Sequence, residues 1–247
     1  MTSAKTPGAS STAPEPGNSR QALSRQTVIE TAIEYVDKHG LAALTMRALG
    51  QELGVEAMSL YHHVNGREDL LEGIVATLVD GLRVNPEESL GPIDGWQTYV
   101  QHLAVSVRQL ANQHPHIFPL VATRHPAAPW LRPPLRSLEL VEDFLDAMSS
   151  RGLDDKTAVH VYKCFTSFLL GHLLLEVSAA SSAPTSPDEA PLDEGDADVP
   201  NADQDLSLDR FPTVLRLREL LAKTDPTAEF ESALEALLDR LDLELSQ

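Results

Sequence analysis

The sequence has little of what disulfide-linked, zinc-binding or membrane-spanning proteins require. Cys164 is the only cysteine among 247 residues, which excludes an intrachain disulfide and a zinc site with two cysteine ligands. Because Cys164 lies in an apolar helical stretch, we interpret it as a small core residue. No uninterrupted apolar run approaches 18 residues, and the N-terminus lacks the hydrophobic stretch of a signal peptide. We therefore expect a cytoplasmic protein that does not use a membrane as a partner.

The sequence also lacks the residue patterns of an enzyme or a metalloprotein. It has no Glu-x-x-His, Gly-x-Ser-x-Gly or glycine-rich phosphate loop, so a helical enzyme would rest on scattered histidines alone. The adjacent pair His62-His63 would point about 100° apart on a helix, whereas a chelating pair needs i, i+4 spacing. His114-Pro115-His116 reads as a plain turn at a helix junction. We predict no catalytic residues, no cofactor and no metal site.

Positive charge is scarce, which argues against a nucleic-acid partner. The chain has 19 Lys and Arg against 37 Asp and Glu, a formal net charge of −18, and DNA is itself an anion. The charge is uneven, however: residues 184–247 carry a net −12, whereas residues 1–83 and 84–183 carry −3 each. Most of the acidity therefore lies far from the N-terminal third of the chain.

Helical periodicity recurs along the chain, and no strand pattern or internal repeat interrupts it. Aromatic residues make up only 5% of the chain, so aliphatic side chains must supply most of the core. Apolar residues at helical spacing, with capping residues at the ends, predict helices at 24–38, 45–53, 56–64, 67–82, 94–113, 116–122, 133–150, 155–180, 212–223 and 227–244. Residues 1–22 and 181–209 are rich in Pro, Ser, Ala or acidic residues, and we predict a disordered tail and a flexible acidic loop. The fold class is all-α.

Residues 45–64 have the pattern of a helix-turn-helix. Gly50 allows the second helix to cross the first closely, Gly54 supplies the positive φ of the tight turn, and Val55 and Leu60 hold the two helices together. The remaining positions of the second helix face outwards and could enter a major groove; they are Ala57, Met58, Ser59, Tyr61 and His63. On this segment alone, an ordinary helical hairpin stays open as the alternative.

The order of helices around this motif resembles the TetR family of transcriptional regulators. The likeness is carried by Leu44-Thr45-Met46-Arg47-Ala48-Leu49, Leu53-Gly54-Val55, Ser59-Leu60-Tyr61-His62-His63-Val64 and Arg67-Glu68-Asp69-Leu70-Leu71. The likeness covers roughly residues 24–82, and within the family the sequence is similar to that of the tetracycline-repressor branch. The resemblance implies a three-helix DNA-binding domain at 23–83. A long fourth helix would join it to a helical ligand-binding and dimerisation domain at 84–247.

The resemblance also implies roles for individual residues in binding double-stranded DNA. Arg47 matches a reader of guanine, and Ala57, Met58 and Ser59 occupy the base-facing first turn of the recognition helix. Thr45, Tyr61, His63 and Arg67 match phosphate contacts. The tetracycline-repressor branch has Gln and Pro where this chain has Ala57 and Met58, so we expect a different operator, with apolar contact to a thymine methyl.

For the second domain the resemblance implies a small-molecule effector that moves the fourth helix, and a homodimer. The candidate effector contacts are Tyr99, His102, Val107, His116, Phe118, Leu120, Trp130, Tyr162 and Phe165, although for each of them ordinary core packing is the interpretation that the sequence favours. Leu120 and Leu103 fall where the tetracycline repressors hold magnesium and drug, so we expect a hydrophobic effector. Helices 155–180 and 227–244 are the predicted dimer interface, and a two-fold dimer would read a palindromic operator. A helical small-molecule-binding module with little DNA binding is the alternative function, and the acidity is its main support.

Overall fold

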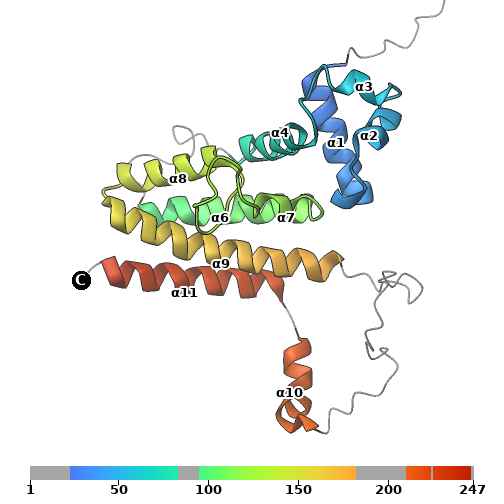
Figure 1. The fold of residues 1–247 in the computed structure, drawn as a ribbon. Coiled ribbons are helices and arrows are strands. Elements are labelled where there is room, and N and C mark those ends of the chain that lie inside the picture. Colours follow the sequence, from blue (N-terminus) through green and yellow to red (C-terminus); the bar gives the residue numbers. More distant parts are fainter. Residues whose placement is uncertain (1–22, 83–94, 182–209, 224, 246–247) are drawn as a thin grey trace, which may run out of the picture.

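The computed structural model describes residues 23–82, 95–181, 210–223 and 225–245, and every regular element in these ranges is a helix (Figure 1). This confirms the all-α class. The predicted tail at 1–22, nearly all of the predicted acidic loop at 181–209 and the expected domain boundary at 83–84 lie outside the described residues, apart from Ser181, which ends a helix.

The N-terminal helices form a small unit, which we call the head. Its elements are α1 (Arg25–His39), the 3₁₀ turn η1 (Leu41–Ala43), α2 (Met46–Glu52), α3 (Ala57–Leu60) and α4 (Arg67–Asp80). Two helices of the head have side-chain N-caps where the predicted helices begin: the Ser24 hydroxyl accepts the Thr27 N–H at 3.1 Å, and the Thr45 hydroxyl accepts the Ala48 N–H at 3.1 Å. Aliphatic side chains from all four α-helices fill the interior of the head, and they belong to one hydrophobic cluster that continues into the second domain.

The second domain is built around one long helix. Its elements are α6 (Trp96–Gln113), α7 (Phe118–Val121), α8 (Leu138–Ser150), α9 (Asp155–Ser181), α10 (Pro212–Ala222) and α11 (Pro226–Leu245). Helix α9 packs against α6, α7, α8 and α11. Figure 1 shows α9 and α11 side by side and running in opposite directions, while α4 leads from the head to this bundle.

Helix α9 is also long and apolar enough, by length and composition, to cross a membrane over residues 155–179. The core helix of a soluble protein meets the same criterion. Here Val161, Phe165 and Leu173 are buried against the neighbouring helices. Packing within the domain therefore accounts for the hydrophobicity of the buried face of α9.

Three predicted helices are shorter than their sequence pattern indicated. The helix expected at 133–150 begins at Leu138, because Pro133 and Pro134 donate no N–H and the Ser137 hydroxyl caps the chain at the Leu140 N–H. The helix expected at 116–122 spans Phe118–Val121, which places Pro119 in the first turn, where no N–H is needed.

The helix expected at 56–64 is α-helical only over Ala57–Leu60. Its continuation is a series of turns in which His62 N–H bonds to the Ser59 carbonyl and His63 N–H to the Leu60 carbonyl. These i→i−3 hydrogen bonds are those of the tighter 3₁₀ type. The recognition helix therefore consists of little more than the turn that would face the DNA bases.

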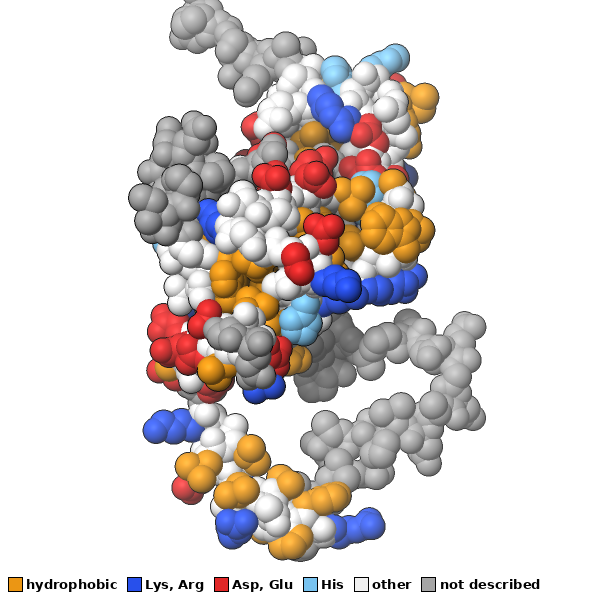
Figure 2. Space-filling view, turned by 90° about the vertical axis from the view of Figure 1, so that its left-hand side faces the viewer, with side chains coloured by type: hydrophobic (Ala, Val, Ile, Leu, Met, Phe, Trp, Pro, Cys, Tyr) orange, Lys and Arg blue, Asp and Glu red, His pale blue; other side chains and the backbone are white. Residues whose placement is uncertain are grey.

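Helix α10 stands away from the bundle (Figures 1 and 2). It has no buried residue, although much of it is apolar. The large exposed side chains at and along it are Phe211, Val214, Leu215, Leu220 and Leu221. Figure 2 shows these hydrophobic side chains together with Lys and Arg at the lower end of the molecule. The helix thus presents apolar surface that nothing else among the described residues covers.

Candidate functional site

Two glycines set the geometry of the helix-turn-helix, as the sequence predicts. Gly54 has φ +67°, a conformation that costs other residues about 1–2 kcal/mol. At Gly50, a Cβ atom would lie 2.9 Å from the Val55 carbonyl oxygen and 3.2 Å from the Ala57 nitrogen. Only a hydrogen at position 50 lets α3 cross α2 at this distance, so the angle between the two helices is fixed by backbone contact.

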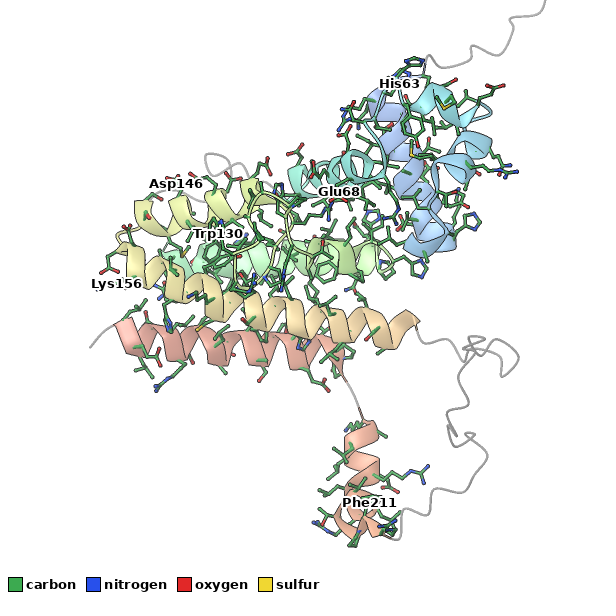
Figure 3. The ribbon with its side chains drawn as sticks, in the orientation of Figure 1. His63, Glu68, Trp130, Asp146, Lys156 and Phe211 are labelled. Carbon is green, nitrogen blue, oxygen red and sulfur yellow. The ribbon has the colours of Figure 1, made fainter. Side chains whose placement is uncertain are left out.

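The side chains that the sequence assigns to DNA contact are mostly exposed on the head. Met58 is 71% exposed and Tyr61 47% exposed, and Arg47 and Arg67 are also exposed, at the beginnings of α2 and α4. Figure 3 shows His63 at the tip of the head. Of the other predicted contacts, Thr45 is exposed at the N-cap of α2, while Ala57 and Ser59 on α3 and His63 in the turns after α3 are half-buried. The fold therefore brings all eight residues to one end of the molecule.

An ion pair that the sequence did not predict, which we call the head lock, connects three segments of the head. The Arg25 guanidinium donates to both carboxylate oxygens of Asp69, at 2.8 and 2.6 Å, and also to the His63 carbonyl at 3.2 Å. Asp69 in turn accepts the backbone N–H of Asn65 at 2.7 Å. One ion pair thereby ties the beginning of α1, the turns after α3 and the beginning of α4.

The lock leaves an electrostatic signature on Asp69. Its hydrogen bonds from Arg25 and from the Asn65 N–H lower its pKa to about 2. Gly66, with φ +112°, gives the chain the sharp bend that precedes α4. The sequence motif contains Asp69, but Arg25 lies 44 positions away, and local spacing carries no signal for their pairing.

The second domain encloses a small apolar cavity. Its volume is about 30 Å³, which is far below the roughly 300–1,000 Å³ of a drug-sized site. The wall is contributed by α6, α7, α8 and α9, together with the chain just after α4 and just before α8. The lining residues are Leu82, Leu103, Val107, Leu110, Val121, Leu135, Leu140, Phe144, Tyr162, Phe165, Thr166, Leu169 and Leu170.

Aromatic rings gather at one side of this cavity around Phe144. The Phe144 ring stacks on Phe165 with centroids 5.7 Å apart and meets Tyr162 edge-on at 5.8 Å. Burial raises the pKa of Tyr162 to about 12, so its phenol stays protonated, and the hydroxyl donates to the Pro133 carbonyl at 3.2 Å. The Thr166 hydroxyl is the other polar group in an otherwise hydrocarbon wall.

The nine predicted effector residues are spread over the domain. Val107, Tyr162 and Phe165 line the cavity. Phe118 and Leu120 are buried beside it, and Tyr99 packs on Phe144 under the Arg151 guanidinium. His102 is exposed, His116 bonds through Nδ1 to the Asp37 carbonyl, and Trp130 is 74% exposed on the segment between α7 and α8 (Figure 3).

Three features together define a DNA-binding transcriptional regulator. They are the exposed recognition helix, the turn whose geometry is set by two glycines, and the connection through α4 to a helical domain with an apolar cavity. The chain belongs to the TetR family. Residues 28–74 match the family described as bacterial regulatory proteins, tetR family. Residues 88–244, more than half of the chain, match the tetracyclin repressor-like C-terminal domain. This is a family of regulators and not of enzymes.

Individual relatives agree with this placement. The chain is 29% identical over 173 residues to the class D tetracycline repressor of Escherichia coli, covering 68% of this chain and 74% of that one. It is 27% identical to the repressor DrrR1 of Streptomyces coeruleorubidus, covering 91% and 79% of the two chains. A possible TetR-family regulator from Streptomyces coelicolor superposes with a TM-score of 0.65 at 26% identity, covering 89% and 98%. ActR from Streptomyces coelicolor, in complex with actinorhodin, shares the fold with a TM-score of 0.65 at 23% identity, covering 92% and 100%.

Proposed function

We propose that this protein is a cytoplasmic homodimeric repressor that binds a palindromic operator through its head and leaves it when a hydrophobic small molecule enters the second domain. The observation that carries the proposal is the exposure of Arg47, Met58 and Tyr61 on a backbone made rigid by Gly50 and by the Arg25–Asp69 pair. The boundary between the domains falls near residues 83–84, between the two family matches.

In this proposal the eight exposed or half-buried head residues divide the work of DNA recognition. The Arg47 fork bonds O6 and N7 of a guanine, while Ala57, Met58 and Ser59 meet the base edges. Met58 is the most exposed of these, so the apolar contact to a thymine methyl falls to it or to Ala57. Thr45, Tyr61, His63 and Arg67 contact phosphates, and Arg67 does so at the N-terminus of α4, where the helix dipole favours an anion.

The effector is a neutral hydrophobic molecule because the cavity wall offers it almost only hydrocarbon. Leu103 and its neighbours on α6 are aliphatic, and Tyr162 and Thr166 supply the only two hydroxyls of the lining. Among the described residues no group of His, Cys, Asp and Glu side chains is placed to hold a metal ion, so a metal–drug chelate is a poor candidate. Leu82, directly after α4, forms part of the wall, so an effector that pushes it moves the head through α4.

Dimerisation supplies the second reading helix that an operator needs, since one short helix reads too few bases. The outer faces of α9 and α11 carry exposed Val159, Leu175 and Leu243, and α10 adds a further apolar surface. A Leu175→Glu substitution should shift the protein toward monomer in sedimentation velocity, while Asp146→Lys, on the exposed side of α8, should not. A monomeric parent protein would contradict the homodimer.

The operator contact is tested by selecting DNA sequences from a random pool at low salt and measuring mobility shifts. Arg47→Ala should weaken binding to the selected operator by about 1–3 kcal/mol, or roughly 5- to 150-fold, with an unchanged circular dichroism spectrum. Arg124→Ala, an exposed arginine of the second domain, is the matched control and should leave the affinity as it is.

Failure to select any operator would favour the alternative function, a helical small-molecule-binding module with little DNA binding. The net charge of −18 is the observation that keeps this alternative in view. The two functions also differ in the effect of a bound hydrophobic ligand. A repressor releases its operator, whereas a binding module changes only its own stability.

A further inference from the structure

Arg136 is a buried cation at the border between the two domains. Its side chain is 6% exposed, and its guanidinium bonds to the carboxylate of Glu68, in the first turn of α4. Glu68 belongs to the head, is 59% exposed and follows directly after Arg67, a proposed phosphate contact. Figure 3 shows Glu68 where α4 meets the body of the molecule. A charge of the second domain thus depends on a partner in the head.

The same arginine is fastened to the wall of the cavity. Its backbone N–H bonds to the carbonyl of Val121 at 3.0 Å, and its neighbour along the chain is Leu135; both Val121 and Leu135 line the cavity. The Arg136 guanidinium also donates to the Thr123 hydroxyl at 3.3 Å, and that hydroxyl donates to the Leu120 carbonyl at 2.7 Å. Any displacement of the wall at these positions therefore moves the guanidinium.

The wall must move when a ligand enters, because a cavity of about 30 Å³ has no room for a molecule with more than a few heavy atoms. We infer that the Arg136–Glu68 ion pair is the link that couples occupancy of the cavity to the position of the head. This inference rests on the proposed function and names the regulation of that same site. Arg136 and Glu68 act as positioning residues, since neither is assigned to touch the effector or the DNA.

An ion pair with a buried charge favours two distinct states, one in which the pair is formed and one in which it is separated. A buried guanidinium that loses its carboxylate is left uncompensated, so partial separation is disfavoured and the pair is either made or replaced by solvent. Arg136 Nε has no hydrogen-bond partner among the described residues, and apart from Glu68 the guanidinium bonds only to the neutral Thr123 hydroxyl, so Glu68 is its one anionic hydrogen-bond partner there. A second bridge, from Asp37 of α1 to His114 Nδ1 at 2.8 Å, also joins the domains, but Asp37 and His114 are each part-exposed and neither lines the cavity.

The experiment measures the coupling between the cavity and the operator site as the ratio of the probe's dissociation constants with and without operator. A variant that changes the probe affinity equally in both states leaves this ratio unchanged. The dissociation constant of 1-aminoanthracene, a neutral fluorescent aromatic, is measured with and without saturating selected operator. By linkage, the parent protein should bind the probe several-fold more weakly on DNA, within the usual range of about 5- to 150-fold. Glu68→Gln should bring the ratio below about twofold while each ligand still binds, and Glu68→Asp, which keeps the carboxylate, should restore much of it.

Two matched variants separate this link from general destabilisation. Glu176→Gln weakens another ion pair within the second domain, Arg108–Glu176 between α6 and α9, and should keep the parent ratio. Asp37→Asn tests the second bridge and should also keep it. The inference is overturned if the parent protein binds probe and operator without coupling, if Glu68→Gln keeps the ratio, or if Glu176→Gln or Asp37→Asn abolishes it. A parent protein that binds neither operator nor probe instead contradicts the proposed function.

Discussion

In the head, the side chains proposed to contact DNA are largely exposed, and what makes them useful is the backbone underneath. In the helical domain, the side chains around the cavity are buried, and they are both the wall of the site and the core of the fold. The same kind of substitution therefore has different consequences in the two domains. Removing an exposed head side chain should weaken operator binding with little effect on stability, whereas removing a cavity side chain should change both effector binding and stability.

The largest effect on stability is expected from Phe144→Ala. The ring contacts Tyr99, Tyr162 and Phe165 and is 2% exposed, so its loss should cost about 3–5 kcal/mol of unfolding free energy. Tyr61→Ala, an exposed aromatic of the head, should cost no more than about 1 kcal/mol yet weaken operator binding. Urea unfolding and mobility shifts on both variants measure the difference; equal losses of stability would remove the distinction between the domains.

Gly50→Ala should have an intermediate effect that is confined to the head. The added methyl would meet the Val55 carbonyl at 2.9 Å, and relieving that contact should cost about 1–3 kcal/mol and shift α3 on α2. Operator binding should fall, while probe binding in the cavity stays at the parent level. Gly81→Ala, where the new Cβ finds only a 3.4 Å contact with the Leu78 carbonyl, is the control and should change stability by less than about 0.5 kcal/mol.

The smallest expected effect is that of Asp69→Asn, which removes the charge of the head lock. Arg25 remains 46% exposed and solvent screens the pair, so we expect a loss of about 1 kcal/mol at neutral pH. Because the folded pKa of Asp69 is lowered to about 2 from 3.8, this stabilisation is present above about pH 4 and is lost as the pH falls toward 2. Unfolding of parent and variant between pH 2 and 6 should converge at the acid end. A difference that persists at pH 2 would show that packing, and not charge, is responsible.

The head could be predicted from sequence because its signals are local. Ser24 and Thr45 cap helices within one residue of the expected start, and Gly54 has the positive φ that the turn requires. The long-range ion pairs could not be predicted, since Arg25 and Asp69 are 44 residues apart and Glu68 and Arg136 are 68 apart. Nothing in the periodicity of either partner marks the other.

The cavity was harder to predict because residue type is a poor guide to side-chain direction. The sequence suggested nine residues of the second domain, most of them aromatic residues or histidines, and among the nine Val107, Tyr162 and Phe165 line the cavity. Phe144 and Thr166 line it too but were not singled out, since both lie in apolar helical stretches whose inward faces look alike. Which of several buried faces surrounds a cavity depends on how α6, α8 and α9 meet, and that is decided by tertiary packing.

The small volume of the cavity also determines how tightly an effector can bind. If the free protein opens only a small fraction of the time, the apparent affinity is the intrinsic affinity multiplied by that fraction; one per cent opening weakens binding about a hundredfold. A substitution near Glu68 that favours the open state would therefore strengthen effector binding without touching a cavity residue. Because the cavity has a volume of only about 30 Å³, the sensitivity of the protein to its effector depends on the equilibrium between the closed and open states of the cavity wall. Substitutions at the far end of α4 can shift that equilibrium.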